Sequence, residues 1–213
     1  MPKSEHSERK STIYKSYLWS NMLDTVNSIK QRIQLINNLS TMPICVPWTD
    51  ISFGATEIQY RQSRLHKIPH TSDTKDLERF MPVVEALNAF KQFGFIHGDL
   101  NKKNIINTPS GFYIVDLEPS LKQKRNDRNS LIGTAPYIAS DDAESNELTY
   151  KTDKLSFYFF ILRVNRWVSS EIIVGLVNGE VEIESYLPVT ESELVNSSYL
   201  EILNIAFSHY RTL

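Results

Sequence analysis

Cysteine and glycine are both scarce in this chain, and each scarcity excludes a class of structure. Cys45 is the only cysteine among the 213 residues, so no disulfide can form within the chain and a reducing compartment is indicated. All seven glycines lie at or after Gly54. The sequence before Gly54 therefore cannot hold a glycine-rich loop, whose backbone N–H groups would surround a phosphate.

Long apolar runs and an excess of one charge are absent as well. No run of about 18 apolar residues occurs, so no membrane span is predicted. The formal net charge of -2 gives no basic excess for binding nucleic acid. Residues 1–11 are polar and charged, lack the apolar stretch of a secretory signal, and are expected to be disordered. We therefore expect a cytoplasmic protein, with delivery into a host cell by a non-classical secretion route left open.

The strongest chemical signal is the sequence HGDLNKKN at residues 97–104, followed after a hydrophobic stretch by Asp116. This order resembles the catalytic loop and the metal-binding segment of the protein kinases, H-R-D-L-x-x-x-N and D-F-G. The resemblance implies that Asp99 orients an acceptor hydroxyl and that His97 supports the loop. It also implies that Asn104 and Asp116 hold Mg²⁺, with the phosphates of ATP completing the coordination shell.

Two departures from the common kinase pattern occur in this region. Leu117 and Glu118 replace the Phe-Gly pair that follows the metal-binding Asp. Leucine can still pack as an apolar plug, whereas Glu118 removes a flexible glycine or adds a third carboxylate near the metal. Asn101 stands where protein-serine kinases commonly carry lysine. The HGDLNxxN form is also similar to that of the RIO kinases and of the bacterial lipopolysaccharide-core sugar kinases.

Two downstream motifs favour the protein kinases over the sugar kinases, which generally lack them. Residues 133–141, GTAPYIASD, resemble the G-T-x-x-Y-x-A-P-E end of an activation segment, with Asp141 in the place of Glu. The resemblance implies that Thr134 supports the acceptor side of the site. Residues 149–157, TYKTDKLSF, resemble the T-x-K-S-D-x-x-S-F start of the central helix. Asp153 is expected to cap that helix and to hold the backbone of the catalytic loop.

The N-terminal part is reduced relative to the kinases that it resembles. Lys15, at the end of a predicted strand, is the candidate for the lysine that contacts the nucleotide phosphates. A surface role for this lysine is an equally good interpretation. A helix is predicted over residues 22–39, but no Glu occurs between Glu8 and Glu57, so the usual Lys–Glu ion pair cannot form there.

The remaining elements follow from periodicity. Strands are predicted over residues 44–48 and 56–61, forming a small sheet with the Lys15 strand. Apolar residues at helical spacing predict helices over residues 76–93, 154–168 and 197–210, of which the second is apolar nearly all round and therefore buried.

These observations predict an α+β protein with a protein kinase-like fold. A disordered N-terminus (residues 1–11) precedes a truncated N-lobe (12–68) with a small antiparallel sheet and one helix, and a mainly helical C-lobe (69–213) follows. The expected activity is transfer of the γ-phosphate of ATP, with Mg²⁺, to a serine or threonine hydroxyl of a protein substrate. Two alternatives stay open: a glycolipid sugar kinase, favoured by Asn101, and a pseudokinase that acts as a binding module, favoured by the missing glycine loop and helix Glu.

Overall fold

The computed structural model describes the chain in segments. They are residues 12–18, 34, 38, 49–53, 57–69, 76–117, 137–145, 147–177, 180 and 182–210, with the side chains of a few strand and helix residues left out. Gln34 and Asn38 are helical, as predicted, but the rest of the predicted helix over 22–39 lies outside the described residues. So do the predicted strand over 44–48, Cys45 and the N-terminal residues 1–11.

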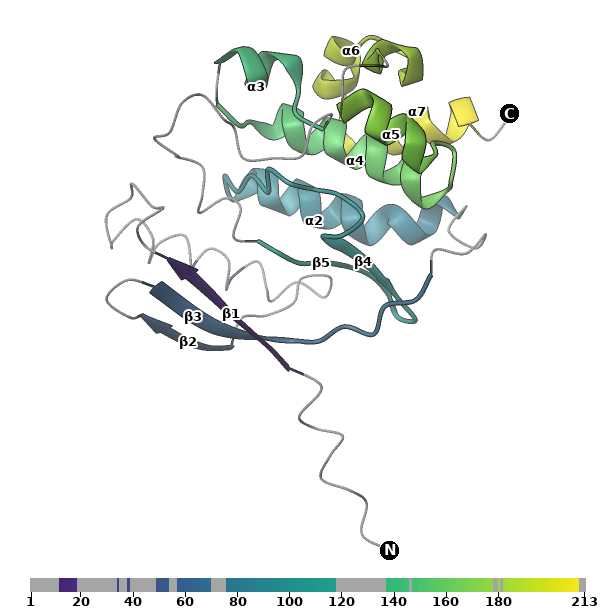
Figure 1. Ribbon diagram of the computed structural model, residues 1–213. Helices are drawn as coiled ribbons and strands as arrows, with labels where there is room; N and C mark the ends of the chain where they lie inside the picture. Colours follow the sequence, from purple (N-terminus) through teal and green to yellow (C-terminus); the bar gives the residue numbers. More distant parts are fainter. Residues whose placement is uncertain are drawn as a thin grey trace, which may run out of the picture.

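Three strands form an antiparallel sheet at one end of the molecule (Figure 1). They are β1 (Thr12–Leu18), β2 (Thr49–Phe53) and β3 (Glu57–Ser63), in the order β1-β3-β2. Threonine, isoleucine and tyrosine in these segments favour extended backbone. Two of the predicted strands, the one with Lys15 and the one over 56–61, are present in this sheet, and Lys15 pairs in register with Tyr60 of β3. The strand before Gly54, however, occupies residues 49–53.

A helix and a hairpin form the middle of the molecule. The 3-10 helix η4 (Leu77–Phe80) leads into α2 (Met81–Gln92), and the hairpin consists of β4 (Ile105–Thr108) and β5 (Gly111–Ile114). The α-helix begins later than predicted because a proline occupies its first turn and Asp76 caps the 3-10 segment instead. The predicted apolar stripe is confirmed, since Val83, Val84, Leu87 and Phe90 are all buried, as is Phe80.

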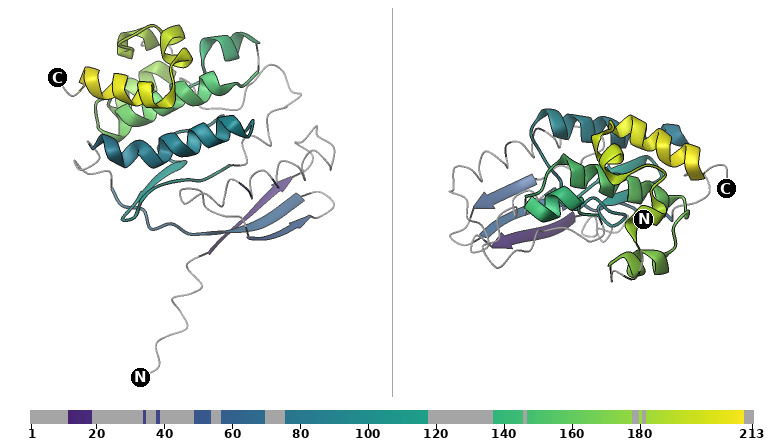
Figure 2. Two further views of the ribbon diagram at one scale, coloured as in Figure 1. Left: turned by 180° about the vertical axis from the view of Figure 1, so that it is seen from behind. Right: turned by 90° about the horizontal axis from the view of Figure 1, so that it is seen from above.

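The C-terminal part is helical. It consists of α3 (Ser140–Ser145), α4 (Tyr150–Val164), α5 (Ser170–Val177), η6 (Ile183–Tyr186), α6 (Glu191–Asn196) and α7 (Tyr199–Tyr210). Helix α2 lies between these helices and the β4–β5 hairpin in both Figure 1 and the reverse view of Figure 2. The mixed α+β architecture with a helical C-terminal part is therefore confirmed. Within the described part, no helix has the length and apolar character needed to cross a bilayer.

Helix α4 is the centre of the core, as its apolar sequence predicted. Nearly every one of its side chains is buried, and it packs against α6 and α7. Phe80 joins the layers, with its ring 6.0 Å from that of Phe160 in α4 and 5.7 Å from that of Phe207 in α7. Such edge-on aromatic pairs add to the free energy gained by burial.

The start of α4 corrects one sequence prediction. Thr149 caps the helix, and Asp153 lies inside the first turn, so the predicted capping role of Asp153 is wrong. Asp141 makes an exposed ion pair with Lys151. Its neighbour Asp142 is buried instead, and it accepts hydrogen bonds from the backbone N–H and the hydroxyl of Thr149.

Candidate active site

The loop at residues 97–104 is anchored by a buried carboxylate of helix α4. Asp153 is fully buried, and its two oxygens accept hydrogen bonds from the backbone N–H groups of His97 (2.8 Å) and Gly98 (2.7 Å). Burial raises the pKa of Asp153 to about 6, while the two backbone donors oppose that rise. The prediction that Asp153 holds the backbone of this loop is therefore confirmed.

His97 links the loop to the segment after β5. The backbone N–H of Asp99 points at its Nδ1 (3.3 Å), and its Nε2 lies 3.0 Å from the carbonyl oxygen of Val115. A backbone N–H can only donate, so Nδ1 accepts and Nε2 carries the proton that it donates to Val115. The fully buried imidazole thus connects Asp99 with the residue that precedes Asp116.

Gly98 is required by the shape of the loop. Its φ angle is +76°, and a Cβ at this position would lie 2.9 Å from the Cδ1 atom of Leu148. Side chains are disfavoured at such angles, and here the space is also taken. The glycine between His97 and Asp99 is therefore a structural part of this loop.

Two amide side chains hold the carboxylate of Asp99. Asn101 donates to Oδ1 (2.9 Å) and Asn104 donates to Oδ2 (3.1 Å), and each also donates to the Asp99 carbonyl oxygen. Asn101 in turn accepts from the backbone N–H of Lys103 at 2.8 Å. Because both oxygens of Asp99 are held, its carboxylate has a fixed direction.

Asp116 lies next to this arrangement. The carbonyl oxygen of Asn104 accepts from the N–H of Val115 (2.8 Å), which brings the end of β5 against the loop. Asp116 has a φ angle of +57°, a conformation that Asp and Asn tolerate better than most residues. The next residue, Leu117, is fully buried, as predicted for an apolar plug.

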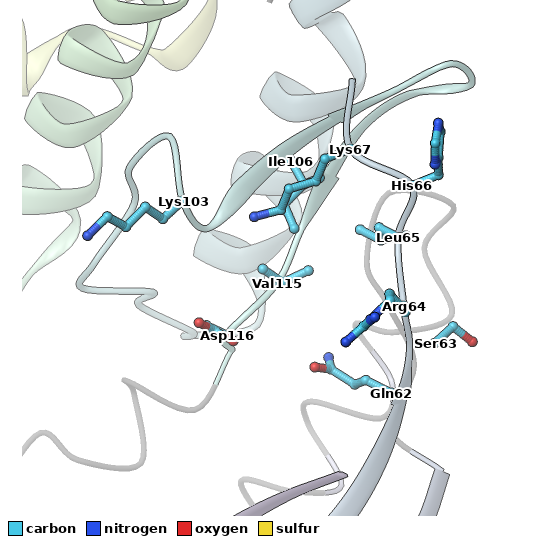
Figure 3. A pocket seen from close by; sticks show the side chains of 10 residues that line it. All are labelled: Gln62, Ser63, Arg64, Leu65, His66, Lys67, Lys103, Ile106, Val115 and Asp116. Carbon is cyan, nitrogen blue, oxygen red and sulfur yellow. The ribbon is translucent and has the colours of Figure 1, made fainter. Parts of the chain in front are cut away.

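A pocket of about 470 Å³ opens beside Asp116. Residues 62–67, at the end of β3 and in the connector that follows it, line one side, and Lys103, Ile106, Val115 and Asp116 line the other. Figure 3 shows Arg64 and Gln62 pointing across the pocket toward Asp116, and Lys67 pointing toward Ile106. The pocket therefore combines apolar walls, cationic side chains and one carboxylate.

The oxygen atoms present suit a hard divalent cation. The amide nitrogen of Asn104 is used by Asp99, which leaves its Oδ1 as a possible ligand beside the Asp116 carboxylate. Among the described residues no cluster of three or more His, Cys, Asp or Glu could hold a metal by itself. A cation here would need further oxygen ligands from a bound substrate, as Mg²⁺ sites at phosphates commonly do.

The structure brings together most of the residues predicted for the site. His97, Asp99, Asn101, Asn104, Asp116 and Asp153 lie in one connected region. The backbone of Lys15 is in β1, but its side chain is not described. Glu118 and Thr134 lie outside the described residues. The roles predicted for these three residues stay predictions.

Sequence reasoning missed the cations of the pocket. Arg64 and Lys67 follow β3 directly, and Lys103 lies inside the catalytic loop, yet none was singled out. Their positions after a strand and between Asn101 and Asn104 are the only signals that the sequence offered.

Removing the anchor of the loop should destabilise the protein. We expect Asp153→Ala to lower the free energy of unfolding by about 2–5 kcal/mol, because two buried N–H groups lose their acceptor. Asp141→Ala, which removes an exposed carboxylate paired with Lys151, should cost at most about 1 kcal/mol. Urea denaturation of both variants measures the difference. Equal, small effects would show that Asp153 does not anchor the loop.

Comparison with known proteins agrees with this geometry. A family model described as RIO domain matches residues 54–133, which include the loop at residues 97–104 and Asp116 but make up less than half of the chain. No curated protein sequence matches the chain. Among solved structures, the kinase PK-1 of Cydia pomonella granulovirus matches with a TM-score of 0.58 and 12% identity, over 91% of this chain and 78% of that one. At this identity, the likeness is evidence for the fold alone.

Proposed function

We propose that this chain, which has a protein kinase-like fold, transfers the γ-phosphate of Mg²⁺-bound ATP to a serine or threonine hydroxyl of a protein. The observation that carries the proposal is the carboxylate of Asp99, held at both oxygens by Asn101 and Asn104 next to a pocket that ends at Asp116. Phosphoryl transfer depends on positioning and on charge, and these residues supply both.

Asp99 is the residue that orients the acceptor. Its carboxylate is partly exposed and fixed in direction, so it can accept a hydrogen bond from an incoming hydroxyl and receive its proton. The two amides that hold it keep this direction without a rearrangement during the reaction. The hydrogen bond from the Gly98 N–H to Asp153 fixes the backbone next to Asp99.

Asn104 and Asp116 are the proposed metal ligands. Mg²⁺ bound there would offset the negative charge of the phosphates. Both residues supply oxygen atoms, and the contact between Asn104 and Val115 keeps the two ligands in adjacent positions. Lys15 is proposed as the phosphate-binding lysine, and Thr134 and Glu118 keep their predicted supporting roles.

The pocket beside Asp116 is the proposed nucleotide site. Leu65, Ile106 and Val115 give it apolar surface for a planar base, and Arg64 and Lys67 give it positive charge for phosphates. Figure 3 shows these cations on the wall opposite Asp116.

Nucleotide affinity should be low. No glycine precedes Gly54, so the N-terminal strands cannot supply a glycine-rich cover over the phosphates. We expect a Kd for Mg²⁺-ATP of about 0.1–1 mM, in the weak part of the usual range of enzyme–substrate affinities. A thermal-shift titration measures it, and the absence of any stabilisation by millimolar Mg²⁺-ATP would argue against a nucleotide site.

The acceptor is proposed to be protein, although a sugar kinase or a pseudokinase could share parts of this site. In the sequence, Asn101 favoured a sugar kinase. In the structure its side-chain NH₂ group donates to the Asp99 carboxylate, and its side-chain oxygen accepts from the backbone N–H of Lys103, so a role within the loop explains its presence. The pair of fixed ligands, Asn104 and Asp116, favours a catalyst over a pseudokinase.

One experiment separates the three. The purified protein is incubated with γ-labelled ATP, Mg²⁺ and a cell lysate, and the label is located by mass spectrometry. Phosphoserine or phosphothreonine, including self-phosphorylation at Ser120, Ser130 or Thr134, supports the proposal. Label found only in glycolipid supports the sugar kinase. No label with ATP still bound supports the pseudokinase.

A further inference from the structure

A second pocket, of about 440 Å³, borders the loop at Lys102. Its lining comes from the connector at Pro69, from Lys102 in the catalytic loop, and from the end of α4 and the following turn, where Arg163 and Arg166 lie. Three of its described lining residues are cations and none is an acid. We refer to it as the basic pocket.

The cations are presented by rigid backbone. Arg163 donates to the carbonyl oxygen of Ser169 (3.0 Å) and to the hydroxyl of Ser170 (3.3 Å), which fixes its guanidinium at the start of α5. Arg166 has a φ angle of +60° in the turn that ends α4. Lys102 lies between Asn101 and Lys103, in the loop that holds Asp99.

Lys102 and Arg163 of the basic pocket lie within electrostatic reach of each other. Burial, Arg163 and Lys103 together lower the pKa of Lys102, in that order of effect, as expected for a cation placed near other cations. Glu171 is an acid next to the pocket; the pKa of its carboxyl is lowered mainly by a hydrogen bond from the Ser169 hydroxyl, and Arg163 adds a smaller lowering effect. An anion placed among the three cations would relieve their mutual repulsion.

The basic pocket is close to the proposed acceptor site. Lys102 is separated from Asp99 by two residues of the same loop. Buried Tyr137 lies within electrostatic reach of both sites. Burial is the main cause of the rise in its pKa; Arg163 opposes this rise, and Asp99 adds to it. A ligand whose hydroxyl approaches Asp99 could therefore reach the basic pocket with a neighbouring group.

We propose that the basic pocket binds an acidic side chain of the acceptor peptide, a carboxylate or a phosphorylated residue, close in sequence to the hydroxyl that Asp99 orients. Lys102 and Arg166 provide exposed positive charge for such an oxyanion, and Arg163, which donates to Ser169 and Ser170, adds positive charge beside them. The site thus selects serine or threonine in an acidic context. This inference rests on the proposed function and adds the class of substrate.

The test uses peptides of one length with a single central serine. The residues that flank this serine are glutamate, phosphoserine, alanine or lysine, one kind in each peptide. Both the affinity and the phosphorylation rate of each peptide are measured. We expect the glutamate and phosphoserine peptides to bind at least about tenfold more tightly than the lysine peptide, with a preference that weakens as salt is added. Inorganic phosphate should compete for the same site.

Charge reversal identifies the pocket. Lys102→Glu and Arg166→Glu should each lower the ratio of affinities for glutamate and lysine peptides by roughly fivefold to tenfold, because an attractive contact becomes a repulsive one. Lys91→Glu on α2 makes the same change of charge on an exposed residue outside the pocket, and it should leave the ratio unchanged. Both pocket variants retain Arg163 and its bonds to the turn, and circular dichroism checks their fold.

Failure of this inference is distinct from failure of the proposed function. Phosphorylation that is indifferent to flanking charge, in the wild type and in both variants, would overturn the inference and leave phosphoryl transfer intact. Charge-selective binding that Lys102→Glu abolishes, without any transfer, would support the anion site and contradict the transfer. If Lys91→Glu changes the ratio as much as Lys102→Glu, the effect is one of net charge and the pocket is not the site.

Discussion

Asp99→Ala should lower the rate of phosphoryl transfer by about 10²–10⁴, the usual effect of removing a group that positions a proton or a hydroxyl. The structure gives the reason, because this carboxylate is the group that the amides of Asn101 and Asn104 hold in one direction. Binding of Mg²⁺-ATP should persist, since Asp99 does not line the pocket beside Asp116. Single-turnover transfer and nucleotide titration measure the two quantities separately.

A matched control is available on helix α2. Glu85 is an exposed acid there, so Glu85→Ala removes one carboxylate without touching the loop, and it should transfer phosphate at the wild-type rate. Wild-type transfer by Asp99→Ala would show that another residue orients the acceptor.

Asp116→Asn should abolish Mg²⁺-dependent transfer, with a loss of at least about 10²-fold, since the proposed metal loses its charged ligand. The fold should not change, because asparagine has the same shape and tolerates the φ angle of +57° at this position. Affinity for ATP without Mg²⁺ should stay near that of the wild type, whereas the gain in affinity on adding Mg²⁺ should disappear. Calorimetric titration with and without Mg²⁺ measures this gain.

The control for this variant is Asp50→Asn. It replaces another aspartate at positive φ, but one that lies in β2 and pairs with Arg61 instead of facing the pocket. It should keep the Mg²⁺-dependent gain. If Asp116→Asn keeps that gain as well, the metal is held elsewhere.

The part of the site that is contiguous in sequence could be predicted from the sequence. The spacing of Asp99 and Asn104 within one loop, and the short β4–β5 hairpin between Asn104 and Asp116, leave little freedom in how these groups meet. The link from Asp153 to His97 spans 56 positions, yet it was predicted because the motif around Asp153 carries it. Local spacing and specific motifs were thus sufficient for the centre of the site.

The sequence did not predict which of two adjacent residues is buried, or which residue caps a helix. Asp141 and Asp142 are adjacent acids, and only packing decides that Asp142 is buried against Thr149 while Asp141 faces solvent. The capping role fell to Thr149 because the helix begins at Tyr150, four residues earlier than periodicity indicated. Cap position and burial both follow from tertiary contacts that the sequence pattern does not contain.

The basic pocket is the clearest case of a feature beyond the reach of sequence. Lys102 and Arg163 lie far apart along the chain, and each alone is an ordinary surface cation. They meet because α4 runs from Asp153, which anchors the loop, to a turn in which the Ser169 carbonyl oxygen accepts a hydrogen bond from Arg163. No local pattern encodes such a meeting.

Methyl NMR of the protein during titration with Mg²⁺-ATP tests the central claim most directly, namely that the pocket beside Asp116 is a nucleotide site. We expect the methyl signals of Leu65, Ile106 and Val115 to shift together, and Mn²⁺-ATP to broaden the Val115 signals strongly because the metal is held by the adjacent Asp116. Methyl groups of α7, such as Leu203, should not respond. If saturating nucleotide leaves the three pocket signals unchanged, the pocket is not a nucleotide site.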